Sequence, residues 1–117
     1  MNAPLLAAQP AALPWTEVCA LADILPASGV CALIGDRQIA VVRCGDAVYA
    51  LGNFDPFSRA MVLSRGIVGD ARGVPKITSP VYKQAFDLRT GRCLDDPTVA
   101  VPTWPCRVID GRVQVQA

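Results

Sequence analysis

The sequence predicts an all-β domain in which antiparallel strands form a sandwich or a barrel. Gly and Pro interrupt the chain at short intervals, and the segments between them are rich in Val, Ile and Ala, as is typical of strands joined by turns. Residues 38–43 are apolar on both faces, which is expected of a strand that a second sheet covers. Near the C-terminus, Asp110–Gly111 separates two short segments, and this dipeptide favours a tight hairpin.

A meander of three strands is expected over Val30–Ile34, Gln38–Arg43 and Val48–Leu51. The connections contain Gly35–Asp36 and Gly45–Asp46, residue types that tolerate the positive φ angles of tight turns. The sequence therefore places these strands side by side in one antiparallel sheet.

Two further strand pairs follow. Residues 66–73 and 74–78 are expected to pair through a glycine-rich connection. Arg107–Ile109 is expected to pair with Arg112–Gln116, whose strict alternation of polar and apolar residues gives one wet and one buried face. Only Val18–Leu25 offers a short helical period, so helix is a minor component.

The chain of 117 residues has the size of one domain, predicted over residues 15–117, after a flexible tail over residues 1–14. At 52% apolar and 18% charged residues, the composition is too hydrophobic for a disordered protein. The tail has no basic residue before its apolar stretch, so we do not interpret it as a signal peptide. No apolar run is long enough to span a bilayer, and a cytoplasmic location is expected.

Charge and residue chemistry exclude several classes of function. The net charge of +1 provides no field to attract nucleic acid or a membrane surface. His is absent, which removes the commonest general base and metal ligand. Gly66, Gly69 and Gly73 are not followed by a helical pattern, so they do not indicate dinucleotide binding. Asp95–Asp96 precedes a proline and is interpreted as a turn. We therefore predict no catalytic residue and no NAD(P)H site in this chain.

Five cysteines are spread along the chain without a C-x-x-C pair: Cys19, Cys31, Cys44, Cys93 and Cys106. An odd number of scattered thiols favours a reducing compartment in which Cys packs as a small apolar residue. A four-Cys iron–sulfur cluster or a redox-sensing thiol is a weaker alternative, because clustered spacing and an activating cation motif are absent.

Two loops carry a family resemblance. Residues 49–57 and 79–91 resemble the two cluster-binding loops of Rieske proteins, which supply C-x-H and C-x-x-H ligands to a [2Fe-2S] cluster. Asp55 and Phe57 stand at the ligand positions of the first loop, and Ser79 and Tyr82 at those of the second. The frame around these positions is retained in Pro56, Phe86–Asp87 and Thr90–Gly91. The resemblance thus implies a Rieske-like fold, and the residues imply a domain without cluster or other metal. Asp55 with Ser79 would supply only two oxygen ligands to a hard cation.

Within the Rieske-like group, the chain is similar to the small subunits of assimilatory NAD(P)H-dependent nitrite reductases. The similarity rests on Asn53–Phe57, Leu63–Asp70 and Ser79–Lys83, in that order. It implies a large-subunit partner that carries FAD, an iron–sulfur cluster and siroheme and reduces nitrite to ammonium. The alternatives are a Rieske-type ferredoxin, which would need a cluster, and a generic β-barrel interaction module.

A cluster-free subunit of this kind is expected to act by docking. Apolar and aromatic residues are concentrated in the two loops, and the possible interface residues are Phe54, Pro56, Phe57, Pro80 and Tyr82. The alternative is that these rings pack on one another and close the end of the domain. Nearby cations could line the same surface or be scattered solvated charges; they are Arg59, Arg65, Arg72, Lys76 and Lys83.

Overall fold

The computed structural model describes residues 13–117 and confirms the all-β prediction. Every strand pairing in this part of the chain is antiparallel, and the helical segments within it are short 3-10 turns. No helix within these residues is long and apolar enough to cross a membrane. The predicted tail falls largely on residues 1–12, which lie outside the described residues, so the domain boundary at residue 15 remains a prediction.

The predicted meander forms the central sheet. Strands β2 (Ser28–Ile34), β3 (Arg37–Cys44) and β4 (Ala47–Gly52) pair in sequence, and β10 (Thr103–Trp104) is added beside β4. Gly35 and Gly45 both have φ of +63° in the two tight connections, so the turn chemistry read from the sequence is confirmed.

A second sheet contains the two ends of the described chain, in the order β1 (Trp15–Ala20), β12 (Arg112–Gln116), β11 (Cys106–Ile109). Asp110 (φ 50°) and Gly111 (φ 75°) form the predicted turn between β11 and β12. The segment Val18–Leu25, which alone offers a helical period in the sequence, does not form an α-helix. Its first part belongs to β1 and gains backbone partners from β12, and only η1 (Leu21–Asp23) is helical.

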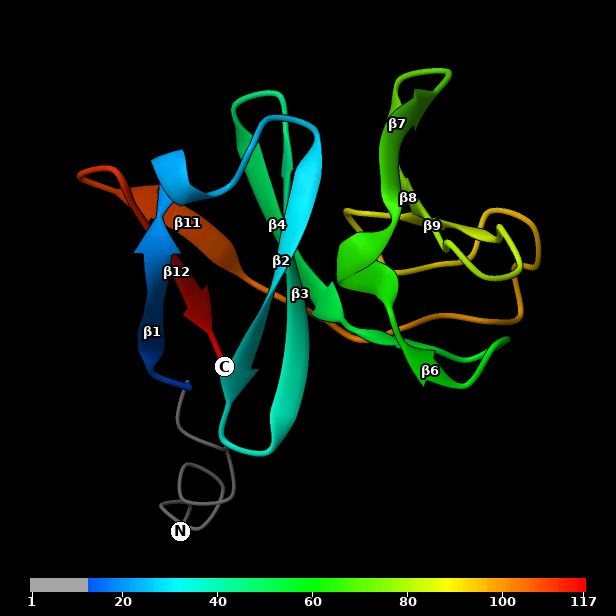
Figure 1. Cartoon of the computed structure of the whole chain (residues 1–117), viewed down its shortest axis with the longest axis horizontal. Coiled ribbons are helices and arrows are strands. Elements are labelled where there is room, and N and C mark those ends of the chain that lie inside the picture. The colour runs from blue at the N-terminus through cyan, green and yellow to red at the C-terminus, as the bar shows by residue number, and fades with distance from the viewer. Residues whose placement is uncertain (1–12) are drawn as a thin grey trace, which may run out of the picture.

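The third sheet consists of β7 (Ile67–Ala71), β8 (Val74–Thr78) and β9 (Ala85–Asp87), and its first two strands are the predicted pair. Between the central sheet and β7, the chain forms the short hairpin β5 (Phe54–Asp55) and β6 (Ala60–Met61). The single turn η2 (Leu63–Arg65) follows. In Figure 1 the β1–β12–β11 sheet and the β7–β8–β9 sheet lie on opposite sides of the central sheet.

Strand β3 contributes to two hydrophobic cores, one on each face. Ile39 and Val41 pack in the core shared with β12, whereas Ala40 and Val42 pack in the core shared with β8 and β9. All four side chains are fully buried. Strand β3 is therefore apolar on both faces because a hydrophobic core covers each face, as the sequence predicted.

All five cysteines are free thiols. The prediction that they pack as apolar core residues is correct for Cys93, which is buried, and for Cys44, Cys19 and Cys106, which border the cores. It is wrong for Cys31, which is exposed because it lies on the solvent side of β2, the edge strand of the central sheet.

Candidate functional site

The carboxylate of Asp55 lies at the centre of the first loop and is fully buried. Its Oδ1 accepts a hydrogen bond from the backbone N–H of Phe57 (2.9 Å), and its Oδ2 accepts one from the hydroxyl of Ser58 (2.8 Å). The backbone N–H of Arg59 donates to the Asp55 carbonyl oxygen at 2.7 Å. The loop over residues 55–59 is thus folded around one acidic residue.

The second loop meets the first at the same carboxylate. Ser79 is buried, and its hydroxyl donates to Asp55 Oδ2 at 2.6 Å. The Ser79 Oγ also accepts a hydrogen bond from the backbone N–H of Val81 (3.3 Å), and the Ser79 N–H donates to the carbonyl oxygen of Gln84 (2.9 Å). The residues at the first ligand position of each loop are therefore in direct contact.

Asp55 is stabilised in its ionised form although no cation contacts it among residues 13–117. Burial raises the pKa of Asp55, but the hydrogen bonds from Ser79, Ser58 and the backbone of Phe57 and Ser58 outweigh burial and lower it below its ordinary value. Asp55 therefore stabilises the folded state more when it is ionised than when it is protonated.

The side chains at the second ligand position of each loop, Phe57 and Tyr82, differ in exposure. Phe57 is half-buried beside the core, with its ring centroid 6.2 Å from that of Phe86 in β9. Tyr82 is 64% exposed. The structure thus brings Asp55 and Ser79 together, turns Phe57 inward and leaves Tyr82 on the surface.

The remaining candidate interface residues lie on the outside of the loops. Phe54 and Pro80 are exposed, and Pro56 is half-buried. A cavity of about 520 Å³ beside the first loop is lined by Phe54 and Pro56 together with Met61, Pro102 and Trp104, and also by the polar residues Asp36, Arg37, Gln38 and Asn53. Apolar surface therefore continues from the first loop toward β10.

Asn53 fixes the first loop to the body of the domain. This buried residue accepts a hydrogen bond from the Ser64 N–H at its Oδ1 (2.7 Å) and donates from its Nδ2 to Gln38 Oε1 (3.2 Å). Its own backbone carbonyl accepts from the Leu63 N–H at 3.1 Å. The entry to β5 is therefore tied to both β3 and η2.

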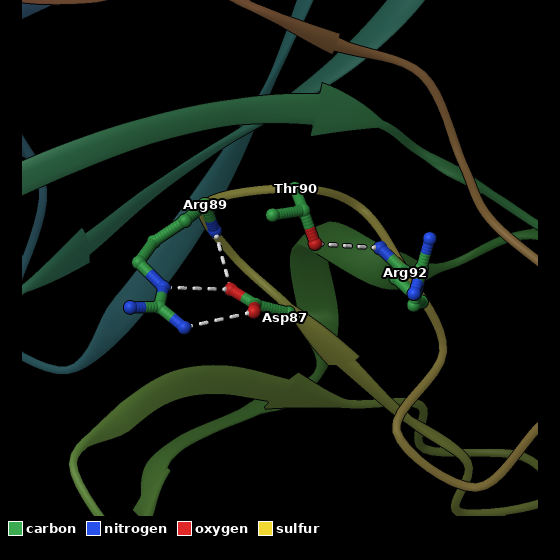
Figure 2. A network of polar contacts seen from close by, with 4 residues as sticks. All are labelled: Asp87, Arg89, Thr90 and Arg92. Carbon is green, nitrogen blue, oxygen red and sulfur yellow. Dashed lines mark hydrogen bonds and ion pairs between the residues drawn. The ribbon is translucent and has the colours of Figure 1, made fainter. Parts of the chain in front are cut away.

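The turn after the second loop is organised by Asp87. Figure 2 shows the Asp87 carboxylate accepting two hydrogen bonds from the Arg89 guanidinium (3.1 and 3.2 Å) and one from the Arg89 backbone N–H (2.8 Å). These contacts lower the pKa of Asp87, chiefly through the Arg89 side chain and against the opposing effect of burial. Gly91 ends the turn with φ of 77°, where a Cβ would lie 2.1 Å from the Val101 carbonyl oxygen.

The arrangement of two neighbouring loops with a Phe–Asp and a glycine turn agrees with the comparison with known families. The model of the Rieske-like [2Fe-2S] domain matches residues 14–116. This chain belongs to that family.

Among Rieske-like proteins, the chain groups with nitrite reductase small subunits. The small subunit of the NADH nitrite reductase of Escherichia coli K12 is 43% identical over 104 residues, which cover 87% of this chain and 96% of that protein. A crystal structure from Mycobacterium tuberculosis, assigned as an NADH-dependent nitrite reductase small subunit, matches with a TM-score of 0.84 and 51% identity. The match covers 88% of this chain and 94% of that one.

A third relative has a different chain organisation. The nitrite reductase [NAD(P)H] large subunit of Klebsiella oxytoca is 50% identical over 102 residues, which are 87% of this chain but 11% of that protein. A segment related to this Rieske-like chain is therefore part of a large-subunit polypeptide.

The residues at the four ligand positions do not fit a Rieske cluster. That cluster needs two thiolates and two imidazoles, and this family member offers a carboxylate, a phenyl ring, a hydroxyl and a phenol. The chain has no His at all. Asp55 Oδ2 already accepts hydrogen bonds from two hydroxyl groups, those of Ser58 and Ser79.

Several features of the site were not predicted from the sequence. The contact between Asp55 and Ser79 could have been inferred, since both stand at ligand positions around one cluster. The roles of Asn53 and Arg89 left no comparable signal, because each depends on partners that only the fold brings close. The same is true of the left-handed backbone at Arg59 (φ 61°) and Lys83 (φ 66°).

Proposed function

We propose that this chain is the accessory small subunit of an NAD(P)H-dependent nitrite reductase and that it acts by contact with the large subunit, without a cluster of its own. The proposal that the chain acts without a cluster of its own rests on the hydrogen bond between Ser79 and Asp55. It joins the two loops with side chains that do not suit iron in place of the Cys and His ligands of a Rieske protein.

The Klebsiella relative supports the large subunit as partner. Since a segment related to this chain is part of that large-subunit polypeptide, we expect a separate chain of the same family to associate with a large subunit. In this proposal the partner carries FAD, an iron–sulfur cluster and siroheme, oxidises NAD(P)H and reduces nitrite to ammonium. The complex works in the cytoplasm, where NAD(P)H is available.

The proposed docking surface is the outer side of the two loops. Phe54, Pro80 and Tyr82 expose apolar surface there, and Pro56 borders them. Exposed apolar residues gathered on loops are a common feature of protein interfaces. Phe57 is assigned to the interior instead, because its ring packs against Phe86.

Reconstitution of the complex tests this proposal. The large subunit is assayed for nitrite-dependent NAD(P)H oxidation with and without this chain, and complex formation is measured by size-exclusion chromatography. We expect a complex and a change in rate or in half-life of activity. If no complex forms and the activity does not change, the result would favour a generic interaction module.

Iron and acid-labile sulfide are measured in the same chain, purified anaerobically. Stoichiometric amounts of both, together with visible absorbance, would instead support the ferredoxin alternative. We expect neither, because the four loop positions lack thiolate and imidazole donors.

A further inference from the structure

Two basic side chains occupy left-handed backbone at the tips of the two loops. Arg59 has φ of 61° and Lys83 has φ of 66°. Residues with a Cβ are disfavoured in this conformation, and Gly or Asn is the usual occupant. Unfavourable conformations of this kind are often retained where the side chain serves a function.

The two cations hold equivalent places in the loops. Arg59 lies four residues after Asp55, and Lys83 lies four residues after Ser79. Because Asp55 and Ser79 are hydrogen-bonded at 2.6 Å, the loops that carry the two cations are neighbours. The tips thus form one surface.

The exposed charges within residues 53–59 and 79–84 are all positive. Two exposed carboxylates lie beside these segments: Asp36 lines a cavity together with Phe54, and Asp95 Oδ2 accepts a hydrogen bond from the Ala85 N–H at 2.8 Å. Asp55 is the single carboxylate within residues 53–59 and 79–84, and it is fully buried. Arg59 and Lys83 are both exposed, and neither forms an ion pair within the described residues. The two loop segments therefore expose two cations and no carboxylate of their own.

Apolar side chains of the same two loops are also exposed. Tyr82 is 64% exposed, Val81 44% and Phe54 43%, and Pro80 is also exposed. Exposed apolar groups with charged neighbours match the usual layout of a protein interface, an apolar centre with a polar rim.

We propose that this loop-tip surface docks on an acidic surface of the nitrite reductase large subunit, with Arg59 and Lys83 at its rim. We define the loop-tip surface by six residues: Phe54, Arg59, Pro80, Val81, Tyr82 and Lys83. The inference rests on the proposed function. It adds the chemistry of the partner, because two exposed cations that form no ion pair within the described residues are complementary to carboxylates on the surface that they meet.

Substitution by glycine separates docking from folding. Arg59→Gly and Lys83→Gly each remove a cation and the unfavourable left-handed Cβ in one step. We expect the melting temperature to stay unchanged or to rise by up to about 4 °C. Arg72→Gly is the matched control, since Arg72 is an exposed cation with φ of 55° in the β7–β8 turn, outside the loop-tip surface.

Binding to the purified full-length large subunit is measured by biolayer interferometry at about 50 mM and about 300 mM NaCl, because salt screens exposed charges. At low salt each loop-tip variant should bind about twofold to fivefold more weakly, and the double variant about tenfold. High salt should shrink these differences, and Lys83→Glu should bind more weakly than Lys83→Gly. Arg72→Gly should bind like wild type.

Two results would overturn the inference while leaving the proposed function intact. In one, wild type forms a complex and the loop-tip variants bind equally well at low salt. In the other, Arg72→Gly weakens binding as much as Lys83→Gly does. If wild type forms no complex at either salt concentration, the proposed function itself fails.

Discussion

The Ser79 hydroxyl donates a 2.6 Å hydrogen bond to the buried carboxylate of Asp55, and this contact joins the two loops of the Rieske frame. The carboxylate also accepts from Ser58 and from the Phe57 N–H. A network of ordinary side chains thus holds loops that a cluster holds in Rieske proteins. The two loops are therefore joined by this chain's own side chains, and Phe54, Pro80 and Tyr82 are exposed on their outer side.

The link between Asp55 and Ser79 should be measurable as a coupling energy. We expect Ser79→Ala to cost about 1.5–3 kcal/mol, because a hydrogen bond to a charged group is lost. Asp55→Ala should cost about 3–5 kcal/mol, because several buried donors lose their acceptor. Urea unfolding of both variants and of the double variant gives the coupling, which we expect to exceed about 1 kcal/mol. Purely additive losses would contradict a direct link.

Acid should weaken the fold through Asp55. Its folded-state pKa is lowered, so its contribution is complete above the unfolded pKa of about 3.9 and is lost as pH falls through the folded value. We expect wild type to lose stability between about pH 5 and pH 2 more steeply than Asp55→Asn does. Urea unfolding across this range checks the slope, and Asp46→Asn, at an exposed turn, is the control. Parallel curves for wild type and Asp55→Asn would exclude this role.

The parts of the fold that the sequence predicts are those with local causes. The β11–β12 hairpin follows from Asp110–Gly111 and a two-residue alternation, and the double burial of β3 follows from its unbroken apolar run. Strand β1 was missed because its partner, β12, lies at the other end of the chain. No short-range pattern reports such a pairing.

The candidate site also has features that the sequence predicts and features that only the fold determines. The resemblance to Rieske loops placed Asp55 and Ser79 at ligand positions of the first and the second loop, and the structure adds the hydrogen bond between them. The left-handed backbone at Arg59 and Lys83 has no signal in residue type, since Gly or Asn is expected there. It follows from the surrounding loop contacts, which are set by tertiary structure.

Phe57 and Tyr82 should respond differently to truncation. Phe57→Ala removes a ring that packs against Phe86, and we expect a loss of about 2–3 kcal/mol, measured by thermal and urea unfolding. Tyr82→Ala removes a mostly exposed ring, and we expect less than about 0.5 kcal/mol of destabilisation but weaker large-subunit binding. If both variants lose stability and still co-purify with the large subunit, docking through these loops is wrong.

The cysteines should differ in reactivity. Burial raises the pKa of the Cys106 thiol to about 12, so this group stays protonated at neutral pH. Cys31 is exposed on β2, and Cys93 is buried in the core. Brief treatment of the folded protein with iodoacetamide near pH 8, followed by peptide mass spectrometry, should show Cys31 modified first and Cys93 and Cys106 protected. Urea should make all five thiols reactive, and rapid labelling of Cys106 in the folded protein would contradict the raised pKa of its thiol.

Gly91 tests whether the retained Rieske frame is structural. A Cβ at this position would lie 2.1 Å from the Val101 carbonyl oxygen, in addition to adopting φ of 77°. We expect Gly91→Ala to cost more than about 3 kcal/mol, because the backbone of the turn must move and the Val101 N–H to Gly91 carbonyl bond of 2.8 Å is strained. Gly73→Ala is the matched control: its φ is 86° but no atom lies within 4 Å of a Cβ, so only the conformational cost of about 1–2 kcal/mol is expected. Equal losses in urea unfolding would show that the contact with Val101 has no role. A larger loss at Gly91 would mean that the glycine turn after the second loop is retained for packing, independently of any cluster.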